Sequence, residues 1–371
     1  MVLKHLAQKH NVHLVSFNQG GQPTEEQIDR IKELGAIVHP IPLDAIKASI
    51  RAIPLTLFAG QPLEIAYYNQ PEFANKVDSL LQEIDFDLIF SFFMRTAEYA
   101  KDKKLKKILM AEDCRELYQE RSYHGTNHPI QKLVRWWEVK KLSKYEPAIM
   151  EKFDMATFVT TNDIAAMTKI NPNAEYRLLT NGTDIERFVP PIGGSVRSGV
   201  LFAGKLDIWA NVLMVSRIVE HIMPKVWAEC PDTVFNIVGA NPTKKILSML
   251  GDRVKLSANV PDMLPYLQQT AVFVHPHSGG SGIQNKLIEA MASACAVVTT
   301  ETGTQGLPAD NGKTIMIGKD DEEIASHIVN LLKNKVLAEE IGNNARAAIV
   351  ENLSWEVVYN QIDGIITELF D

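Results

Sequence analysis

The sequence predicts an α/β protein made of two doubly wound domains, each with a parallel sheet covered by helices. Short apolar runs alternate with helical patterns along almost the whole chain, and they fall into two series. The length of 371 residues also exceeds what one ordinary hydrophobic core accommodates. We therefore expect two domains built from βαβ units.

The expected strands are continuous apolar runs, which are typical of strands buried on both faces of a sheet. The first series comprises Val12–Phe17, Ile37–Leu43, Leu88–Phe93, Lys107–Ala111, Met155–Thr161 and Tyr176–Leu179. The second comprises Gly199–Ala203, Val234–Val238, Val254–Ser257, Ala271–His275, Ala296–Thr300 and Thr314–Ile317.

A breaker-rich segment separates the two series. Asn181-Gly182 is a turn dipeptide, and the run Pro190–Gly194 reads PPIGG. We expect a first domain over residues 1–185, a second over 186–350, and a helix over 351–371 that crosses back to the first. The chain opens on an amphipathic helical pattern, Met1–Lys9, where α/β domains usually open on a strand. The first domain is therefore expected to lack its first strand, which would expose a sheet edge.

Composition narrows the function classes. The net charge of −7 predicts no nucleic-acid partner. Cys114, Cys230 and Cys295 are too widely spaced for a disulfide framework or a zinc cluster, which fits a cytoplasmic protein. No run approaches the roughly 20 apolar residues that span a bilayer, and no signal peptide is visible.

The segment Ser278–Ala292 carries the clearest chemistry. It follows the expected strand Ala271–His275, and its three glycines lead into a helical pattern. Glycines let the backbone approach a ligand, and the free N–H groups of a first helical turn attract phosphate. Lys286 adds a charge suited to a diphosphate, and Glu289 is placed to bind ribose hydroxyls. Since most α/β domains contain such a loop, Glu289 as a solvated helix residue is the alternative.

Residues 279–300, GGSGIQNKLIEAMASACAVVTT, resemble the donor-site signature of glycosyltransferase family 4, in its bacterial exopolysaccharide and sugar-transferase-like branch. The resemblance covers nearly the whole chain and is closest on the donor side. The other matching stretches are Gly199–Gly204 followed by Asn211-Val212, Phe235–Gly239, Val260–Tyr266, Asn181–Asp184 with Phe188, Arg95–Tyr99 and Ala111–Asp113. It implies the GT-B fold, in which two Rossmann-like domains face a central cleft.

The resemblance implies a retaining transfer of a hexose from a UDP- or GDP-sugar, without a bound metal, to a glycan, lipid-linked or small-molecule acceptor. The donor-binding residues it implies are Gly204, Lys205, Gly280, Ser281, Gly282, Gln284, Asn285, Lys286 and Glu289. Lys205 and Lys286 would stabilise the charge that develops on the leaving diphosphate. The family pattern has two glutamates with seven residues between them, and at the first of these positions this chain has Ser281, so the donor sugar stays unidentified.

Glu112 is the candidate catalytic residue on the acceptor side. It follows the expected strand Lys107–Ala111, and the carboxyl edge of a parallel sheet is where such sites form. A carboxylate there is placed to bind or deprotonate an acceptor hydroxyl. The alternative is a helix N-cap at Asp113. Arg95 and Tyr99 bind acceptor or phosphate in one interpretation and are ordinary helix residues in the other.

Other chemistry-bearing groups leave two interpretations open. Asp85-Phe-Asp87 spells the DxD string of metal-dependent transferases, but charges at a strand entrance are the favoured interpretation. His275 and His277 line a sugar pocket or are structural; a metal pair is the third interpretation, but HxH alone needs further ligands and none is obvious. Cys114 has no base beside it.

The basic stretch Gln131–Lys152, with two tryptophans, is either a solvated helix face or a peripheral contact with the inner face of the cell membrane. We favour the solvated face. Two other function classes also stay open: a non-catalytic nucleotide-sugar-binding or scaffold protein, and a UDP-sugar epimerase of the same fold.

Overall fold

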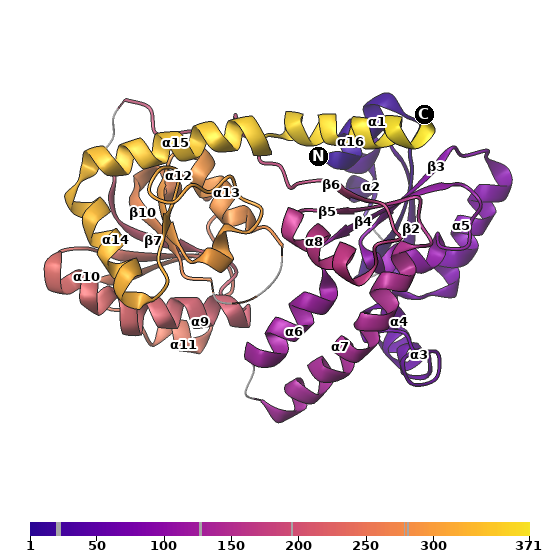
Figure 1. The fold of residues 1–371 in the computed structure, drawn as a ribbon, viewed down its shortest axis with the longest axis horizontal. Coiled ribbons are helices and arrows are strands. Elements are labelled where there is room, and N and C mark those ends of the chain that lie inside the picture. Colours follow the sequence, from indigo (N-terminus) through magenta and orange to yellow (C-terminus); the bar gives the residue numbers. More distant parts are fainter. Residues whose placement is uncertain (20–23, 126–127, 194–195, 278, 280–281) are drawn as a thin grey trace. The chain divides into compact units, whose positions relative to one another are not determined.

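The computed structural model describes residues 1–371 except 20–23, 126–127, 194–195, 278 and 280–281. The chain forms two compact units, Met1–Leu179 with Tyr359–Asp371, and Thr180–Val358 (Figure 1). Residues 180–185, which we expected at the end of the first domain, belong to the second unit in this division. All twelve expected strands have a counterpart in the structure.

The first unit contains two parallel sheets in its described part. A two-stranded sheet pairs β1 (His13–Gln19) with β2 (Ile37–Leu43). A four-stranded sheet has the order β3 (Leu88–Phe92), β4 (Lys106–Glu112), β5 (Met155–Phe158) and β6 (Tyr176–Leu178). Within β4 the side chains from Ile108 to Ala111 are buried, as expected for an inner strand covered on both faces.

Helices cover these sheets, and α1 precedes β1 at the start of the chain (Figure 1). The helices are α1 (Val2–Lys9), α2 (Glu25–Lys32), α3 (Ala45–Leu57), α4 (Leu63–Tyr68), α5 (Pro71–Glu83), η1 (Met94–Tyr99), α6 (Arg115–Gly125), α7 (Pro129–Met150) and α8 (Thr161–Ile170).

The end of the last helix, α16 (Trp355–Phe370), also belongs to the first unit from Tyr359 onward. There Asp363 accepts a hydrogen bond from Lys9 Nζ at 2.6 Å and contacts His5 Nε2 at 2.8 Å. The His5 ring stacks on Tyr359 at 4.2 Å. These contacts hold the two ends of the chain together through α1.

The second unit contains a six-stranded parallel sheet. Its order is β12 (Met316–Ile317), β11 (Ala296–Thr299), β10 (Thr270–His275), β7 (Ser198–Ala203), β8 (Phe235–Gly239) and β9 (Val254–Ala258). The chain starts in the middle at β7, runs to one edge, and returns to β10 beside β7 before it continues to the other edge. This reversal of strand order makes the carboxyl ends of β7 and β10 the ordinary place for a ligand.

The helices of this unit are α9 (Trp209–Arg217), η2 (Ile218–Ile222), α10 (Met223–Glu229), α11 (Lys244–Leu247), α12 (Leu264–Gln269), α13 (Asn285–Ala292), η3 (Glu301–Thr304), α14 (Asp321–Lys333) and α15 (Lys335–Leu353). The core between sheet and helices is completely buried at Val200, Phe202, Phe235, Val272 and Val274. This matches the continuous apolar runs of the sequence. No helix in the described ranges of either unit is long and apolar enough to span a membrane.

Candidate functional site

Two glycines shape the backbone where the strand order of the second unit reverses, at the carboxyl ends of its central strands. We call this place the switch point. A Cβ on Gly204, at the end of β7, would lie 2.9 Å from Asn211 Nδ2 and 3.2 Å from Lys286 Nζ. A Cβ on Gly239, at the end of β8, would lie 1.7 Å from the carbonyl oxygen of Gly204. The loop after β7 therefore packs with no room for side chains, and this packing brings Lys286 of α13 to the end of β7.

Lys286 is held at this point by neutral groups. Its Nζ donates to Asn211 Oδ1 at 2.9 Å, and Asn211 Nδ2 in turn donates to the carbonyl oxygen of Lys205 at 2.8 Å. Burial lowers the pKa of Lys286 to about 8, although the charge of Glu289 opposes this. Among the described residues Lys286 forms no salt bridge. A nearby anion would therefore stabilise its charge.

The N-terminus of α13, like Lys286, favours an anion. The helix begins at Asn285, and its N-cap Gln284 makes no side-chain capping bond. Gly282, just before it, has a φ of 74°, which favours glycine. Uncapped amides and the helix dipole together attract an anion. The predicted ligands Gly280 and Ser281 lie outside the described residues.

Glu289 and Lys205 complete the predicted donor set. Glu289 is half-buried on α13, and burial raises the pKa of its carboxyl while Arg187 and Lys286 pull it down. The Lys205 side chain is exposed to solvent. Asn285 accepts a hydrogen bond from Asn181 Nδ2 at 2.9 Å, which ties α13 to the first residues of this unit. Asn211 belongs to a segment of the family resemblance, but its part in holding Lys286 was not predicted.

His275 lies behind Lys286 at the end of β10. Its ring is completely buried, parallel to Phe202 at 6.0 Å and stacked on His277 at 5.3 Å. Among the described residues, neither ring nitrogen has a hydrogen-bond partner. Burial, and then the charge of Lys286, hold its pKa well below the usual range. His275 is therefore neutral and packs as an apolar ring.

Metal ligands are not gathered anywhere in the described part of the chain. No group of three His, Cys, Asp or Glu residues there could hold a metal ion. Asp85 and Asp87, the two acids of the DxD string, are both exposed in front of β3. This placement agrees with the interpretation of charges at a strand entrance.

In the first unit, Glu112 lies at the carboxyl end of β4, where a bulge interrupts the pairing with β5. Its φ is 69°, a left-handed conformation that is rare for residues other than glycine. Burial raises its pKa to about 7, helped by Asp113 and opposed by Arg95 and Arg115. Backbone strain of this kind is concentrated at functional sites.

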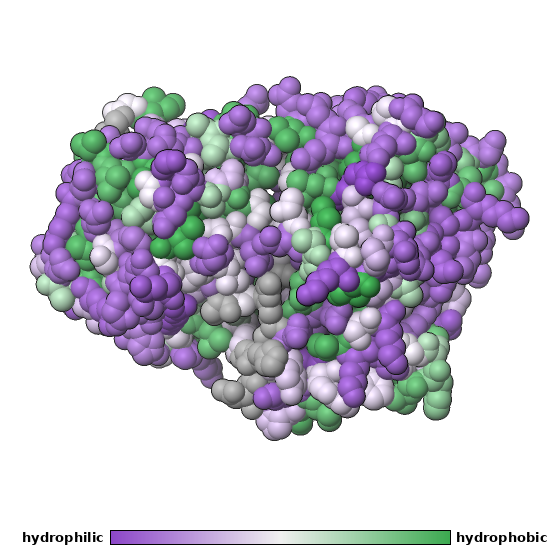
Figure 2. Space-filling model, in the orientation of Figure 1, coloured by the Kyte–Doolittle hydropathy of each residue, from purple (hydrophilic) through white to green (hydrophobic). Residues whose placement is uncertain are grey.

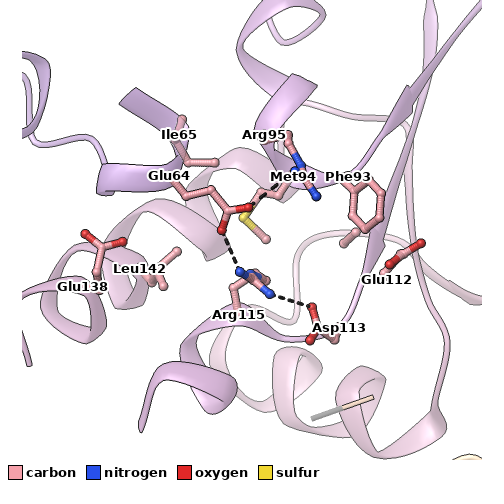
Figure 3. Close-up of a pocket in the computed structure, with 11 residues that line it drawn as sticks. Glu64, Ile65, Phe93, Met94, Arg95, Glu112, Asp113, Arg115, Glu138 and Leu142 are labelled. Carbon is pink, nitrogen blue, oxygen red and sulfur yellow. Dashed lines mark hydrogen bonds and ion pairs between the residues drawn. The ribbon is translucent and has the colours of Figure 1, made fainter. Parts of the chain in front are cut away.

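Glu112 lines a cavity of about 110 Å³ that also holds two guanidinium groups (Figure 3). Arg115 Nη2 lies 2.6 Å from Glu64, and its Nη1 lies 3.7 Å from Asp113. Arg95 is 3.9 Å from Glu64 and lies over the Phe93 ring. The lining residues are Glu64, Ile65, Phe93, Met94, Arg95, Ala111, Glu112, Asp113, Arg115, Glu138 and Leu142.

Two buried carboxyls of α7 hold the helices around this cavity. Glu138 Oε1 accepts a hydrogen bond from the Leu63 amide at 2.8 Å, at the start of α4. Glu146 accepts bonds from the amides of Arg115 and Glu116, both at 2.9 Å, at the start of α6. Burial raises the pKa of Glu146 to about 8. The sequence pattern gave no signal for either role, because both acids lie in a long helix far from β4.

Tyr99 and Cys114 belong to the framework. Tyr99 is buried, and its hydroxyl accepts from the Gln70 amide at 2.8 Å and donates to the Tyr68 carbonyl. Burial raises the pKa of the Cys114 thiol, so it stays protonated. Of the predicted acceptor-side residues, the structure brings Glu112 and Arg95 to one cavity and leaves Tyr99 outside its lining.

Comparison with known proteins agrees with this architecture. Residues 197–334 match the model of the family described as glycosyl transferases group 1. The chain is 23% identical over 303 residues to an uncharacterized 44.6 kDa protein in the cps region of Klebsiella pneumoniae, covering 77% of each. It is 29% identical over 196 residues to phosphatidyl-myo-inositol mannosyltransferase of Mycolicibacterium smegmatis, covering 50% of each, so it matches half the length of that relative.

A solved structure has the same fold. HepE of Anabaena in complex with UDP and glucose superposes with a TM-score of 0.64 at 15% identity, over 96% of this chain and 100% of that chain. The fold is therefore that of the GT-B glycosyltransferases. The predicted resemblance to glycosyltransferases is confirmed over residues 197–334, and this segment, which matches the group 1 model, contains every predicted donor residue from Gly204 to Glu289.

Proposed function

We propose that this protein is a retaining hexosyltransferase that uses a UDP- or GDP-sugar and needs no metal ion. The observation that carries the proposal is the position of Lys286, which lies at the β7–β10 switch point, against Gly204 and beside the N-terminus of α13. A nucleoside diphosphate placed there would meet one lysine and a row of uncapped amides. HepE, which has the same fold, was solved with UDP and glucose.

In this proposal the residues of the second unit stabilise the leaving group. The diphosphate gains negative charge as the glycosidic bond breaks, and Lys286 with the α13 amides is fixed in advance to receive it. Asn211 keeps the ammonium group in place. Glu289 binds the ribose hydroxyls, and Lys205 reaches the phosphates from the loop after β7.

Glu112 acts on the acceptor in this proposal. Its pKa of about 7 lets a large part of the molecules carry a carboxylate at neutral pH and still take up a proton. Arg95 and Arg115 lie in the same cavity and orient the acceptor. We propose a glycan, lipid-linked or small-molecule acceptor, and peripheral contact with the inner face of the cell membrane. The relative in Mycolicibacterium smegmatis is named for transfer to a phosphatidyl-inositol lipid.

Nucleotide binding tests the donor site directly. Glu289→Ala should weaken the binding of UDP or GDP, whichever the wild type prefers, by about 1.5–3 kcal/mol, because it removes a charged hydrogen-bond acceptor. Isothermal titration calorimetry gives the dissociation constant. Glu340→Ala, in the exposed face of α15, is the matched control. A folded Glu289 variant with wild-type affinity would overturn the ribose assignment.

Incubation with UDP-glucose, GDP-mannose and related donors tests the activity. A transferase releases nucleotide slowly without acceptor and faster with one, and NMR of the product should show the anomeric configuration of the donor. Chelator should leave the rate unchanged. Nucleotide binding without turnover on any acceptor indicates a scaffold, and interconversion of the sugar indicates an epimerase.

A further inference from the structure

Helix α3 exposes its large apolar side chains and buries its small ones. Its buried positions are Ala48, Ala52 and Thr56. Its exposed apolar residues are Ile46, Ile50, Ile53, Leu57 and, directly after the helix, Phe58. Ile46 is 74% exposed and Phe58 is 87% exposed. Single exposed apolar residues are ordinary, but a row on successive turns of one helix marks an interaction surface.

Helices α4 and α7 extend this surface. Arg51 of α3 donates to the carbonyl oxygen of Asn69, which caps the end of α4. Helix α4 and the start of α7 line a second, shallow cavity. The exposed apolar residues of α7 near this end are Ile130, Leu133, Val134 and Trp136. Figure 2 shows apolar residues gathered where Figure 1 draws α3.

The charges on these two helices have one sign. Helix α3 contains Lys47 and Arg51 and no acid, apart from the N-cap Asp44 before it. The cations of α7 are Lys132, Arg135, Lys140, Lys141 and Lys144. Its two acids, Glu138 and Glu146, are only 6% and 0% exposed and are bound to backbone amides. A chain with a net charge of −7 therefore presents a positive apolar surface here.

We propose that α3 and the N-terminal half of α7 form a surface that docks onto a bilayer containing anionic lipids. The apolar row of α3 enters the boundary of headgroups and acyl chains, and the lysines and arginines contact the headgroups. Trp136, with Lys140 at 4.1 Å over its ring, suits this interface. A second copy of the chain fits less well, because two surfaces of the same charge repel each other.

Docking at this place would bring lipid close to the candidate acceptor cavity. Glu64 and Glu138 line both that cavity and the shallow one between α4 and α7. A lipid-linked acceptor would thus reach Glu112 from the membrane side. The docking specifies the surface for the membrane contact in the proposed function, and only this last step depends on the proposed transfer activity.

Flotation of the full chain with vesicles tests the docking without any measurement of transfer. We expect binding to vesicles of phosphatidylcholine that contain 30% phosphatidylglycerol, a composition chosen for the assay. Little binding is expected to phosphatidylcholine alone. Ile50→Gln with Ile53→Gln should reduce the partition by about tenfold for each isoleucine lost. Lys132→Gln with Lys140→Gln should reduce it by about fivefold for each charge, and more at low salt than at high salt.

The control variant is Val336→Gln with Leu247→Gln, which removes exposed apolar residues of α15 and α11. It should float like the wild type. Because all these positions are exposed, circular dichroism should show unchanged thermal unfolding. The proposal is overturned by equal flotation of the α3 and control variants, or by no flotation on anionic vesicles. A dimer in light scattering that only the α3 variant dissociates, without vesicle binding, would assign the surface to self-association instead.

Discussion

The two candidate sites lie at the carboxyl ends of parallel strands in their own units, but they are built differently. The site of the second unit is shaped largely by main chain, with two glycines and a helix N-terminus, and it adds the Lys286 side chain held by the neutral amide of Asn211. The site of the first unit consists of side chains: four acids and two arginines from four separate segments. The first arrangement suits an anion of fixed shape, and the second suits a polar ligand of variable shape.

Burial acts on the key group of each site in opposite directions. It lowers the pKa of Lys286 to about 8 and raises the pKa of Glu112 to about 7. In both sites the neighbours partly cancel the effect, through Glu289 in one and through Arg95 and Arg115 in the other. The comparison teaches that the key group of each site has a pKa near neutral pH, and that desolvation is the main cause of the shift in both.

Removal of the lysine should have the largest effect on activity. Lys286→Ala is expected to lower kcat by about 10²–10³, because a fixed charge at the leaving group is lost. Steady-state kinetics with the identified donor measures this, and Lys245→Ala on the exposed face of α11 is the control. A rate within threefold of wild type would contradict the role of Lys286.

The pKa of Lys286 gives this prediction a second readout. A bound diphosphate should raise the pKa from about 8 towards its ordinary value, so nucleotide binding above pH 8 takes up a proton and weakens as the pH rises. Calorimetry in two buffers of different ionisation enthalpy detects the uptake. It should vanish in Lys286→Ala and persist in Lys245→Ala.

Glu112→Gln should have the next largest effect, a loss of about 10² in kcat/KM. For the wild type we expect kcat/KM to rise with pH through about 7, as the carboxyl loses its proton. This limb should be absent in Glu112→Gln. Asp113→Asn is the informative control, because the charge of Asp113 raises the pKa of Glu112 and its removal should move the limb to lower pH.

Glu112→Gln should also gain stability relative to the wild type as the pH rises. The folded pKa of Glu112, about 7, lies above its ordinary value of 4.5, so ionisation between these values costs stability as the pH rises. Glu112→Gln removes that cost, and its melting temperature relative to wild type should be higher at pH 8 than at pH 5. A pH-independent difference would contradict the buried, ionising carboxyl.

The comparison also explains what the sequence predicts well. The second unit's site comes from short segments at the ends of β7, β8 and β10, so the glycines, the lysine and the helix start are each visible in a local stretch of sequence. The first unit's cavity joins Glu64 of α4 to Arg115 of α6 and Glu138 of α7. No local pattern links these positions, because the folding of α7 against α4 and α6 brings them together.

Two features of the first unit differ from the sequence-based expectations, because they too depend on contacts between distant parts of the chain. Tyr99 belongs to a stretch that resembles the family, but its hydroxyl is bound to backbone groups of Tyr68 and Gln70, which lie about thirty residues earlier in the chain. The exposed apolar row of α3 was not predicted, since helical periodicity tells which residues share a face and not which face is covered.

The smallest expected effect concerns Glu146, the buried acid that supports the first unit's cavity. Glu146→Gln should cost about 1 kcal/mol at pH 6, because an amide side chain replaces one of two hydrogen-bond acceptors. The pKa of Glu146 is about 8 when folded against an ordinary 4.5, so wild-type stability falls as the pH rises through this range. The variant does not ionise, and its deficit should shrink at pH 8.5.

Urea unfolding followed by tryptophan fluorescence measures this difference, since Trp136 and Trp137 lie on the same helix as Glu146. Glu151→Gln, exposed at the end of α7, should change stability by less than about 0.5 kcal/mol at either pH. If Glu146→Gln also loses kcat/KM while nucleotide affinity stays unchanged, the support that α7 gives to α6 extends to catalysis. In the second unit's described site, neutral amide side chains hold the start of α13 instead, through Asn181 to Asn285 and Asn211 to Lys286, so this variant tests the difference between the two sites directly.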